Sequence, residues 1–397
     1  MPHKRKGRKI YTYRVRNRKM FSKGHPMRSA LGIVLTLLLT VFAGIVGYSI
    51  AAPVIERLSA EAESPTTVPA ETTSTTTMQQ TETTTSASVT TSTSYTESTV
   101  ETTVSTSKTI PQRFSEPVQL VYCVPEENMN DAELLNITAE SLVSQGYTAM
   151  MYPLKSVGGA LLYSSGVSEA QTCGASDPAR LSLEDLTQIA WTRGMSCMAL
   201  FDTLNDNLYP AGFQSGAYCI TEGGRWLDTA EERGGKPWIS PFSESARGYL
   251  SALTQEISGA GFSRIYCSDL IFPHFRDSDI RYLGSYVKNP ERRAEAISAV
   301  MSGITDSASG ALYTGKYGEE TTAEVVSALS PETAVSLQIS PSSAAKAKEQ
   351  LSAARNLAGD RPFIPWVVRG SMPESELNAV LDMLYESGYR EIVVSDS

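Results

Sequence analysis

Two aspartates that follow predicted strands are the residues of this chain best suited, by type and spacing, to do chemistry. Asp202 follows the β-rich run 196–201, and Asp269 follows the run 264–268. Two carboxyl groups a few ångströms apart can act as acid and as base or nucleophile on a glycosidic bond. Neighbouring strands of a parallel sheet lie about 4.8 Å apart. If these two runs are neighbours, Asp202 and Asp269 are candidate catalytic residues.

Other common catalytic groups are scarce in this sequence. His274 is the only histidine beyond the N-terminal region, which holds His3 and His25. A histidine-rich zinc site is therefore excluded, and a Ser-His-Asp or Cys-His site would have to use His274. The five cysteines form no CxxC pair, and the sequence contains neither GxGxxG nor GxxxxGKS/T. We expect buried cysteines, no metal and no cofactor, which leaves hydrolysis to the carboxylates.

The elements that must position these residues alternate regularly from residue 117 onward. Eight β-rich runs cover residues 118–123, 148–154, 196–201, 264–268, 311–314, 334–339, 363–368 and 391–394. Helical patterns lie between them at residues 131–144, 182–193, 243–259, 290–306, 320–329, 342–357 and 373–387. This alternation predicts an α/β fold, a (β/α)8 TIM barrel over residues 115–397 that lacks an eighth helix. An open doubly wound sheet is the alternative.

A TIM barrel gathers its functional groups at the C-terminal ends of its strands. Asp202 and Asp269 both end strands there, but side chains alternate along a strand, so Asp269 faces the interior only if the chain bends at that point. Lys155 and Arg369 follow strands at the same end, and Tyr266 lies on the strand that ends next to Asp269. These three are candidate substrate-binding residues.

The longest predicted connection, residues 202–242, is rich in aromatic side chains. It contains Trp226 and Trp238 together with several Tyr and Phe residues. Loops of this length are usually functional, and the flat faces of Trp rings are suited to stacking on sugars. The alternative is that the rings form a small core of the loop itself. Trp226 and Trp238 are therefore candidate sugar-binding residues with a structural alternative.

Four segments resemble a family of glycoside hydrolase TIM barrels, known largely from bacterial sequences and distantly like the amylase-type barrels. They read MYPLKSVGGALLY, WLD, GGKPWISPFSESARGYL and GFSRIYCSDLIFP, at residues 151–163, 226–228, 234–250 and 261–273. The resemblance implies a barrel that handles sugars. It also implies substrate-binding roles for four matching residues, which are Lys155, Tyr163, Trp226 and Trp238.

The same segments depart from the family pattern where chemistry is expected. Ser268 stands in place of the family's strand-ending Asp, with Asp269 one position later, and Ile271 stands in place of its Arg. Pro153 and Cys197 likewise replace a charged residue each. The resemblance therefore implies the fold and an association with sugars more directly than it implies turnover.

The N-terminal region predicts a membrane anchor. Residues 1–28 carry eleven Lys and Arg and no acid, and residues 29–55 carry no charge and are mostly apolar, which is long enough to cross a bilayer. The positive-inside bias predicts a single-pass segment with a cytoplasmic N-terminus. A cleaved signal peptide is the alternative. The basic residues could also contact nucleic acid, but beside an apolar segment they are better explained as an orientation signal, so no nucleic acid is expected.

A tether separates this anchor from the barrel. Residues 56–114 are dominated by Ser and Thr, a composition that cannot bury enough apolar surface to fold, so we expect a disordered linker. The chain is then a cell-membrane protein with an extracellular barrel. Two functions fit: a glycoside hydrolase acting on cell-wall polysaccharide or peptidoglycan, or a catalytically inactive barrel that binds glycan or an envelope partner.

Overall fold

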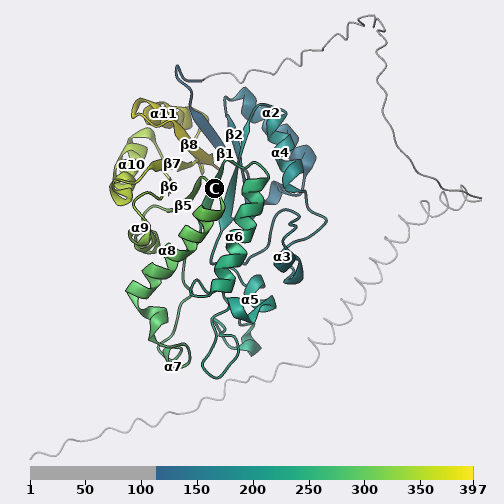
Figure 1. Ribbon diagram of the computed structural model, residues 1–397. Coiled ribbons are helices and arrows are strands. Elements are labelled where there is room, and N and C mark those ends of the chain that lie inside the picture. The colour runs from purple at the N-terminus through teal and green to yellow at the C-terminus, as the bar shows by residue number, and fades with distance from the viewer. Residues whose placement is uncertain (1–112, 397) are drawn as a thin grey trace, which may run out of the picture. The chain divides into compact units, whose positions relative to one another are not determined.

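Eight parallel strands close into a barrel in the computed structural model, which describes residues 113–396 (Figure 1). Each strand pairs with the next along the chain, and β8 pairs with β1. The strands are β1 Gln119–Cys123, β2 Ala149–Lys155, β3 Ser196–Asp202, β4 Arg264–Ser268, β5 Ala311–Lys316, β6 Val335–Ile339, β7 Phe363–Val368 and β8 Glu391–Ser395. The predicted TIM barrel is confirmed, and the closed order of strands excludes the open sheet.

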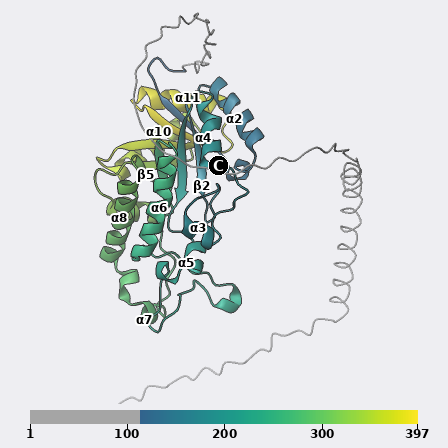
Figure 2. The ribbon, with the colours of Figure 1, turned by 45° about the vertical axis from the view of Figure 1, so that its right-hand side comes forward.

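Seven helices of the described region form the layer outside the strands, at the positions that the sequence pattern predicts. They are α2 Ala132–Ser144, α4 Leu183–Trp191, α6 Glu244–Gly259, α8 Pro290–Ser307, α9 Glu320–Ala328, α10 Ala344–Ala358 and α11 Glu374–Glu386. Helix α4 begins with a capping box, in which the Ser182 hydroxyl accepts from the Asp185 amide and the Asp185 carboxylate accepts from the Ser182 amide. Figures 1 and 2 show α6 and α8 packed side by side on the outside of the barrel.

The strands are buried on both faces, as their nearly continuous apolar sequences require. All seven residues of β2 are buried. One cluster fills the barrel interior and includes Met151, Met198, Tyr266 and Trp366. A second, larger cluster lies between the barrel and the helices. Alternate residues along a strand therefore belong to different cores, which sets the direction of a side chain at a strand end wherever the alternation is unbroken.

Strand β2 breaks this alternation near its end. Pro153 has no amide hydrogen to donate to the ladder, and the pairing with β3 shifts there: Pro153 pairs with Leu200, but Lys155 pairs with Phe201. Between these two pairs β2 therefore contains one residue more than β3, which is the geometry of a β-bulge. The Lys155 side chain is consequently carried to the outer side of β3, the side occupied by Phe201.

Three short helices that the sequence pattern did not predict lie in the connections that leave β2, β3 and β4. They are α3 Ser168–Thr172, α5 Leu208–Gly212 and α7 Ile280–Leu283. Because they follow the C-terminal ends of these strands, they extend the barrel at that end on the β2 to β4 side. Figure 1 shows α5 and α7 gathered at one end of the molecule, well beyond the strands.

The five cysteines differ in their burial. Cys123, Cys197 and Cys267 are buried within strands as predicted, but Cys173 is half-buried and Cys219 is exposed, so for these two the prediction of burial is wrong. All five are free.

Between residues 113 and 396, no helix is both long and apolar enough to traverse a bilayer. The predicted segments 1–28 and 29–55, and the predicted linker up to residue 112, lie outside the described residues.

Candidate functional site

Asp202 lies at the C-terminal mouth of the barrel, where its carboxyl group meets Ser268 of the next strand. The two residues pair across β3 and β4, and the Ser268 hydroxyl donates a hydrogen bond to Oδ1 of Asp202. Asp202 follows Met198 and Leu200 on the face of β3 that packs in the barrel interior. Only 8% of its surface is exposed. The carboxyl is therefore held at the top of the interior, nearly out of water.

This environment makes Asp202 a weak acid for its type. Its pKa is raised from 3.8 to about 6, mainly by burial and to a smaller extent by the charges of Asp269 and Glu126, while the Ser268 hydrogen bond and the charge of Lys155 oppose the rise. A carboxyl with a pKa of about 6 is half protonated at pH 6 and largely protonated at about pH 5. It can then donate a proton, which an exposed aspartate cannot do at that pH.

Asp269 is the second predicted catalytic residue, and the chain does bend at it. Its φ is 49°, and within the described part of the chain it is the only residue other than glycine with a positive φ. The Leu204 amide donates to its carbonyl at 3.0 Å, and the Asn205 side-chain amide donates to its Oδ2 at 3.2 Å. Its carboxylate therefore lies at the end of β4, beside the end of β3 that carries Asp202, and its charge contributes to the raised pKa of Asp202.

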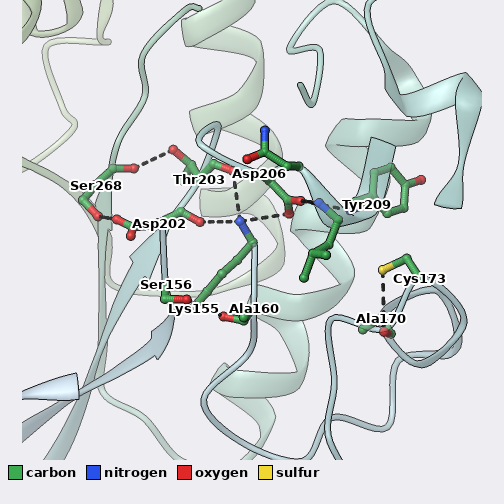
Figure 3. A network of polar contacts seen from close by, with 12 residues as sticks. Lys155, Ser156, Ala160, Ala170, Cys173, Asp202, Thr203, Asp206, Tyr209 and Ser268 are labelled. Atoms are coloured by element: carbon green, nitrogen blue, oxygen red, sulfur yellow. Dashed lines mark hydrogen bonds and ion pairs between the residues drawn. The ribbon is translucent and has the colours of Figure 1, made fainter. Parts of the chain in front are cut away.

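Lys155 is at the centre of a buried network beneath these residues (Figure 3). Its ammonium group donates to the carbonyls of Asp202 and Thr203, at 2.8 and 3.3 Å. It also forms an ion pair of 3.0 Å with Oδ2 of Asp206, and neither side chain has any exposed surface. The prediction that Lys155 contacts substrate is not supported by this placement, because protein atoms occupy the whole surface of its side chain.

A cavity of about 380 Å³ opens at the mouth, between residues of β1, β2, β3 and β6 to β8, and neither Asp202 nor Asp269 is among its lining residues. Its wall includes Glu126 and Glu127, which follow β1, and its lining also includes Cys123, Val124, Pro125, Pro153, Leu200, Gln338, Trp366, Ser395 and Asp396. Burial and the neighbouring Glu127 raise the pKa of Glu126. The indole of Trp366 is fixed by a hydrogen bond of 3.0 Å to the Ser395 hydroxyl. The cavity therefore combines a fixed aromatic ring with carboxylates.

The aromatic loop after β3 largely forms its own core, as the structural alternative proposed. Trp226 is 4% exposed and packs with Tyr218, Phe275, Leu283 and Val287. The Trp226 and Phe275 rings are 4.9 Å apart. Burial on this scale is incompatible with stacking on a sugar, so the predicted binding role of Trp226 is not supported. Trp238 lies at the edge of the cluster, half-buried, with its indole nitrogen 3.3 Å from Asp228.

Two predicted contacts are tyrosines buried elsewhere. The Tyr163 hydroxyl donates to Glu256 of α6 at 2.8 Å, and the Tyr266 hydroxyl donates to Glu391 at 2.9 Å. Both tyrosines have no exposed surface. Glu391 begins β8, so Tyr266 points to the end of the barrel opposite the mouth. Because neither side chain reaches the mouth, their predicted binding roles are not supported.

Arg369 follows β7, but it lines a separate groove. This groove, of about 300 Å³, lies between α2 and α11 over the outer faces of β1 and β8, and its lining includes Tyr122, Tyr147 and Asp396. The Arg369 guanidinium donates to the carbonyl of Met372 at 3.2 Å. Arg369 is therefore half-buried next to the mouth rather than in the cavity with Glu126.

Several residues of the site were missed from the sequence. Asp206 and Asn205 lie inside a loop, and nothing in their spacing indicates that they return to Lys155 and Asp269. Trp366 could have been found, since it lies in a strand two residues before the mouth on the inward face. Within residues 113–396 no three His, Cys, Asp or Glu side chains are grouped to hold a metal ion.

Comparisons with known proteins do not identify a family for this chain. No protein-family model and no curated protein matches the chain. A hypothetical protein from Ruminiclostridium thermocellum ATCC 27405 is 14% identical over 48% of this chain and 96% of its own, with a TM-score of 0.38. The GH20 exo β-N-acetylglucosaminidase of Vibrio harveyi is 10% identical over 71% of this chain and 50% of its own, with a TM-score of 0.44.

An α-galactosidase from Thermus thermophilus, TtGalA, is 10% identical over 72% of this chain and 63% of its own, with a TM-score of 0.40. The present chain thus covers about half to two thirds of these two hydrolases. At such identities and TM-scores the likeness does not extend to an activity. The distant resemblance to amylase-type barrels, suggested by the sequence segments, remains a prediction.

Proposed function

We propose that the barrel hydrolyses O-glycosyl bonds of a polysaccharide, with Asp202 as the proton donor. The observation that carries this proposal is the Asp202 carboxyl, buried at the C-terminal mouth with its pKa raised to about 6. A glycosidase needs one carboxyl that is protonated at working pH, so that it can protonate the leaving oxygen. The Ser268 hydroxyl, which donates to Oδ1, orients the group.

Asp269 is the proposed partner carboxylate. It follows the adjacent strand β4, and its Oδ2 is fixed by Asn205 at 3.2 Å. In this role Asp269 either takes a proton from the water that attacks the anomeric carbon, or attacks that carbon itself to form a glycosyl-enzyme that water then hydrolyses; in both cases the leaving oxygen takes the proton of Asp202. The cavity walled by Glu126 and Glu127, with the ring of Trp366 in its lining, is proposed to receive a sugar ring, and the half-buried Trp238 to lie along the chain of the polysaccharide.

A catalytically inactive barrel that binds glycan or an envelope partner is the second candidate. It is favoured by one observation: Asp202 is only 8% exposed, and neither Asp202 nor Asp269 is among the residues that line the mouth cavity. A glycan bound in that cavity would then not meet the proposed acid. In this case the Asp202 carboxyl would be a structural group, and its substitution would leave binding unchanged.

The location proposed for either function is the cell envelope, with peptidoglycan or a cell-wall polysaccharide as the substrate or ligand. It is supported by the sequence alone, through the basic residues 1–28, the uncharged residues 29–55 and the Ser/Thr-rich stretch that follows. Fractionation of cells with a tag at the C-terminus, followed by protease treatment of intact cells, tests it. Protection of the tag from protease would contradict an extracellular barrel.

The hydrolytic proposal is tested by reducing-sugar release from isolated cell-wall polysaccharide and peptidoglycan. The variants are Asp202→Asn, Asp269→Asn and the pair combined, and Asp185→Asn is the control because Asp185 is an exposed capping residue of α4. We expect each site variant to lower the rate at least ~100-fold, the usual effect of removing an acid or base. Equal rates for the wild type and the double variant would refute the catalytic assignment.

Sedimentation with the same wall material distinguishes the second candidate. A hydrolase whose Asp202→Asn variant still binds would co-sediment as a stable complex and release no sugar. A wild-type protein that co-sediments, releases no sugar and is unaffected by Asp202→Asn would instead establish the inactive binding barrel. Both candidates therefore predict co-sedimentation, and they differ in whether the wild-type protein releases sugar.

A further inference from the structure

We propose that Lys155 is a positioning residue, whose ammonium group holds the backbone of Asp202 and locks the loop after β3 onto the barrel. This inference rests on the proposed function only in naming Asp202 as the proton donor. The contacts themselves belong to the fold. The role replaces the direct substrate contact predicted from the sequence for Lys155, a residue with 1% of its surface exposed.

The ammonium group of Lys155 joins two parts of the chain around Asp202. Its bonds to the carbonyls of Asp202 and Thr203, at 2.8 and 3.3 Å, fix the peptide units at the end of β3. The ion pair of 3.0 Å with Asp206 extends this hold to the loop. The two carbonyls use two of the three donors of the ammonium ion, and the Asp206 carboxylate balances its charge. A substituent of another shape or charge would leave at least one buried acceptor without a partner.

Asp206 passes this constraint into the loop after β3. Its Oδ1 accepts from the amides of Leu208 and Tyr209, both at 2.9 Å, and so caps the turn that begins α5. The loop after β2 closes over the same carboxylate, and the Gly158 amide donates to the Asn205 carbonyl at 2.7 Å. A Cβ at Gly159, whose φ is 100°, would lie 2.2 Å from Oδ1 of Asp206. The glycine leaves room for the carboxylate.

The charges of the network also act on Asp202. The Lys155 charge opposes the rise of the Asp202 pKa, whereas the charges of Asp269 and Glu126 add to it. Because Asp206 is an anion paired with Lys155, it offsets part of the cation's effect. Removing Lys155 and removing the charge of Asp206 should therefore move the titration of Asp202 in opposite directions. A side chain that merely fills space would have no such opposite effects.

The test measures the titration of Asp202 directly, by ¹³C NMR of the side-chain carboxyls, with the resonance assigned through its loss in Asp202→Asn. The variants are Lys155→Met and Asp206→Asn, and the matched control is Lys348→Met, which removes an exposed lysine of α10. We expect the midpoint of Asp202 to rise by about one pH unit in Lys155→Met and to fall by a few tenths in Asp206→Asn. Lys348→Met should leave it unchanged.

Shifts of opposite sign support the positioning role, and shifts of the same sign, or no shift, overturn it. If Lys155→Met does not fold, Asp206→Asn decides alone, since the asparagine side chain keeps an Oδ1 acceptor: a lowered midpoint supports the role, and an unchanged or raised one refutes it. The measurement needs no substrate. Opposite shifts in a protein that releases no sugar would therefore retain the role of Lys155 while the proposed hydrolysis fails.

Discussion

Replacing Asp202 by Asn should stabilise the protein above neutral pH and leave its stability unchanged in acid. The substitution keeps the size of the side chain and an oxygen that accepts from Ser268, and it removes only the titration. In the folded protein burial raises the pKa of Asp202 to about 6, whereas an aspartate in the unfolded chain has a pKa near 3.8. The folded state thus binds a proton more tightly than the unfolded state does.

The sign and size follow from proton linkage. A raised pKa means that ionised Asp202 destabilises the fold, fully so above pH 6, and that this penalty vanishes as the pH falls below 3.8. A difference of about two pKa units corresponds to about 3 kcal/mol at 1.36 kcal/mol per unit. We therefore expect Asp202→Asn to be more stable than the wild type by about 3 kcal/mol at pH 8, by about half as much at pH 5, and not at all at pH 3.

Urea denaturation of both proteins at several pH values between 3 and 8 measures this difference. Asp185→Asn is the control of opposite sign, because hydrogen bonds from Ser182 lower the pKa of Asp185, so that this substitution should destabilise the fold at neutral pH and not in strong acid. A stability difference between Asp202→Asn and the wild type that does not change with pH would refute the reasoning. So would a variant that is less stable at pH 8.

Three further outcomes are expected. Gly159→Ala should lower the free energy of unfolding by more than about 2 kcal/mol, because its Cβ would meet Asp206 and its φ is 100°, whereas Gly174→Ala, with a φ of 74° and open space around it, should lose only about 1 kcal/mol. Trp226→Ala should cost about 3 kcal/mol or more in urea denaturation, since its ring is buried against Phe275. If the protein hydrolyses a glycan, its rate should fall as the pH rises through about 6, the pKa of Asp202; a rate that stays constant to pH 8 would contradict its role as the acid.

The barrel could be predicted from the sequence because its elements repeat a simple pattern. Each strand is a short apolar run, and each helix between strands has its own apolar face and an identifiable start, such as the capping box at Ser182. These signals are local and agree with one another from residue 117 onward. The short helix α5 has a weaker signal, because it is only five residues long and its N-cap Asn207 makes no side-chain cap hydrogen bond; the Asp206 carboxylate instead accepts from the amides of its first turn.

The candidate site was predictable only in part. The position of Asp202 follows from strand alternation, and so does its meeting with the end of β4. The direction of the Lys155 side chain does not follow from strand alternation, because the register shift after Pro153 turns this side chain away from the mouth. The tryptophans of the loop were equally ambiguous: a long excursion from a barrel needs an apolar core of its own, and Trp226 serves that core rather than a ligand.

The turn at Asp269 explains how neighbouring strands can supply two interacting carboxyls in spite of alternation. Cys267 lies in the core outside the barrel, and Ser268 points inward to Asp202, so an extended chain would direct Asp269 outward again. The left-handed backbone conformation of Asp269, with a φ of 49°, interrupts this alternation of side-chain directions. Aspartate adopts it at a smaller cost than most residues do, and Asn205 and Leu204 hold it by hydrogen bonds. Because such backbone conformations persist only where their surroundings impose them, the loop that Lys155 and Asp206 anchor fixes Asp269 as well as Asp202, and the two carboxyls depend on one buried ion pair.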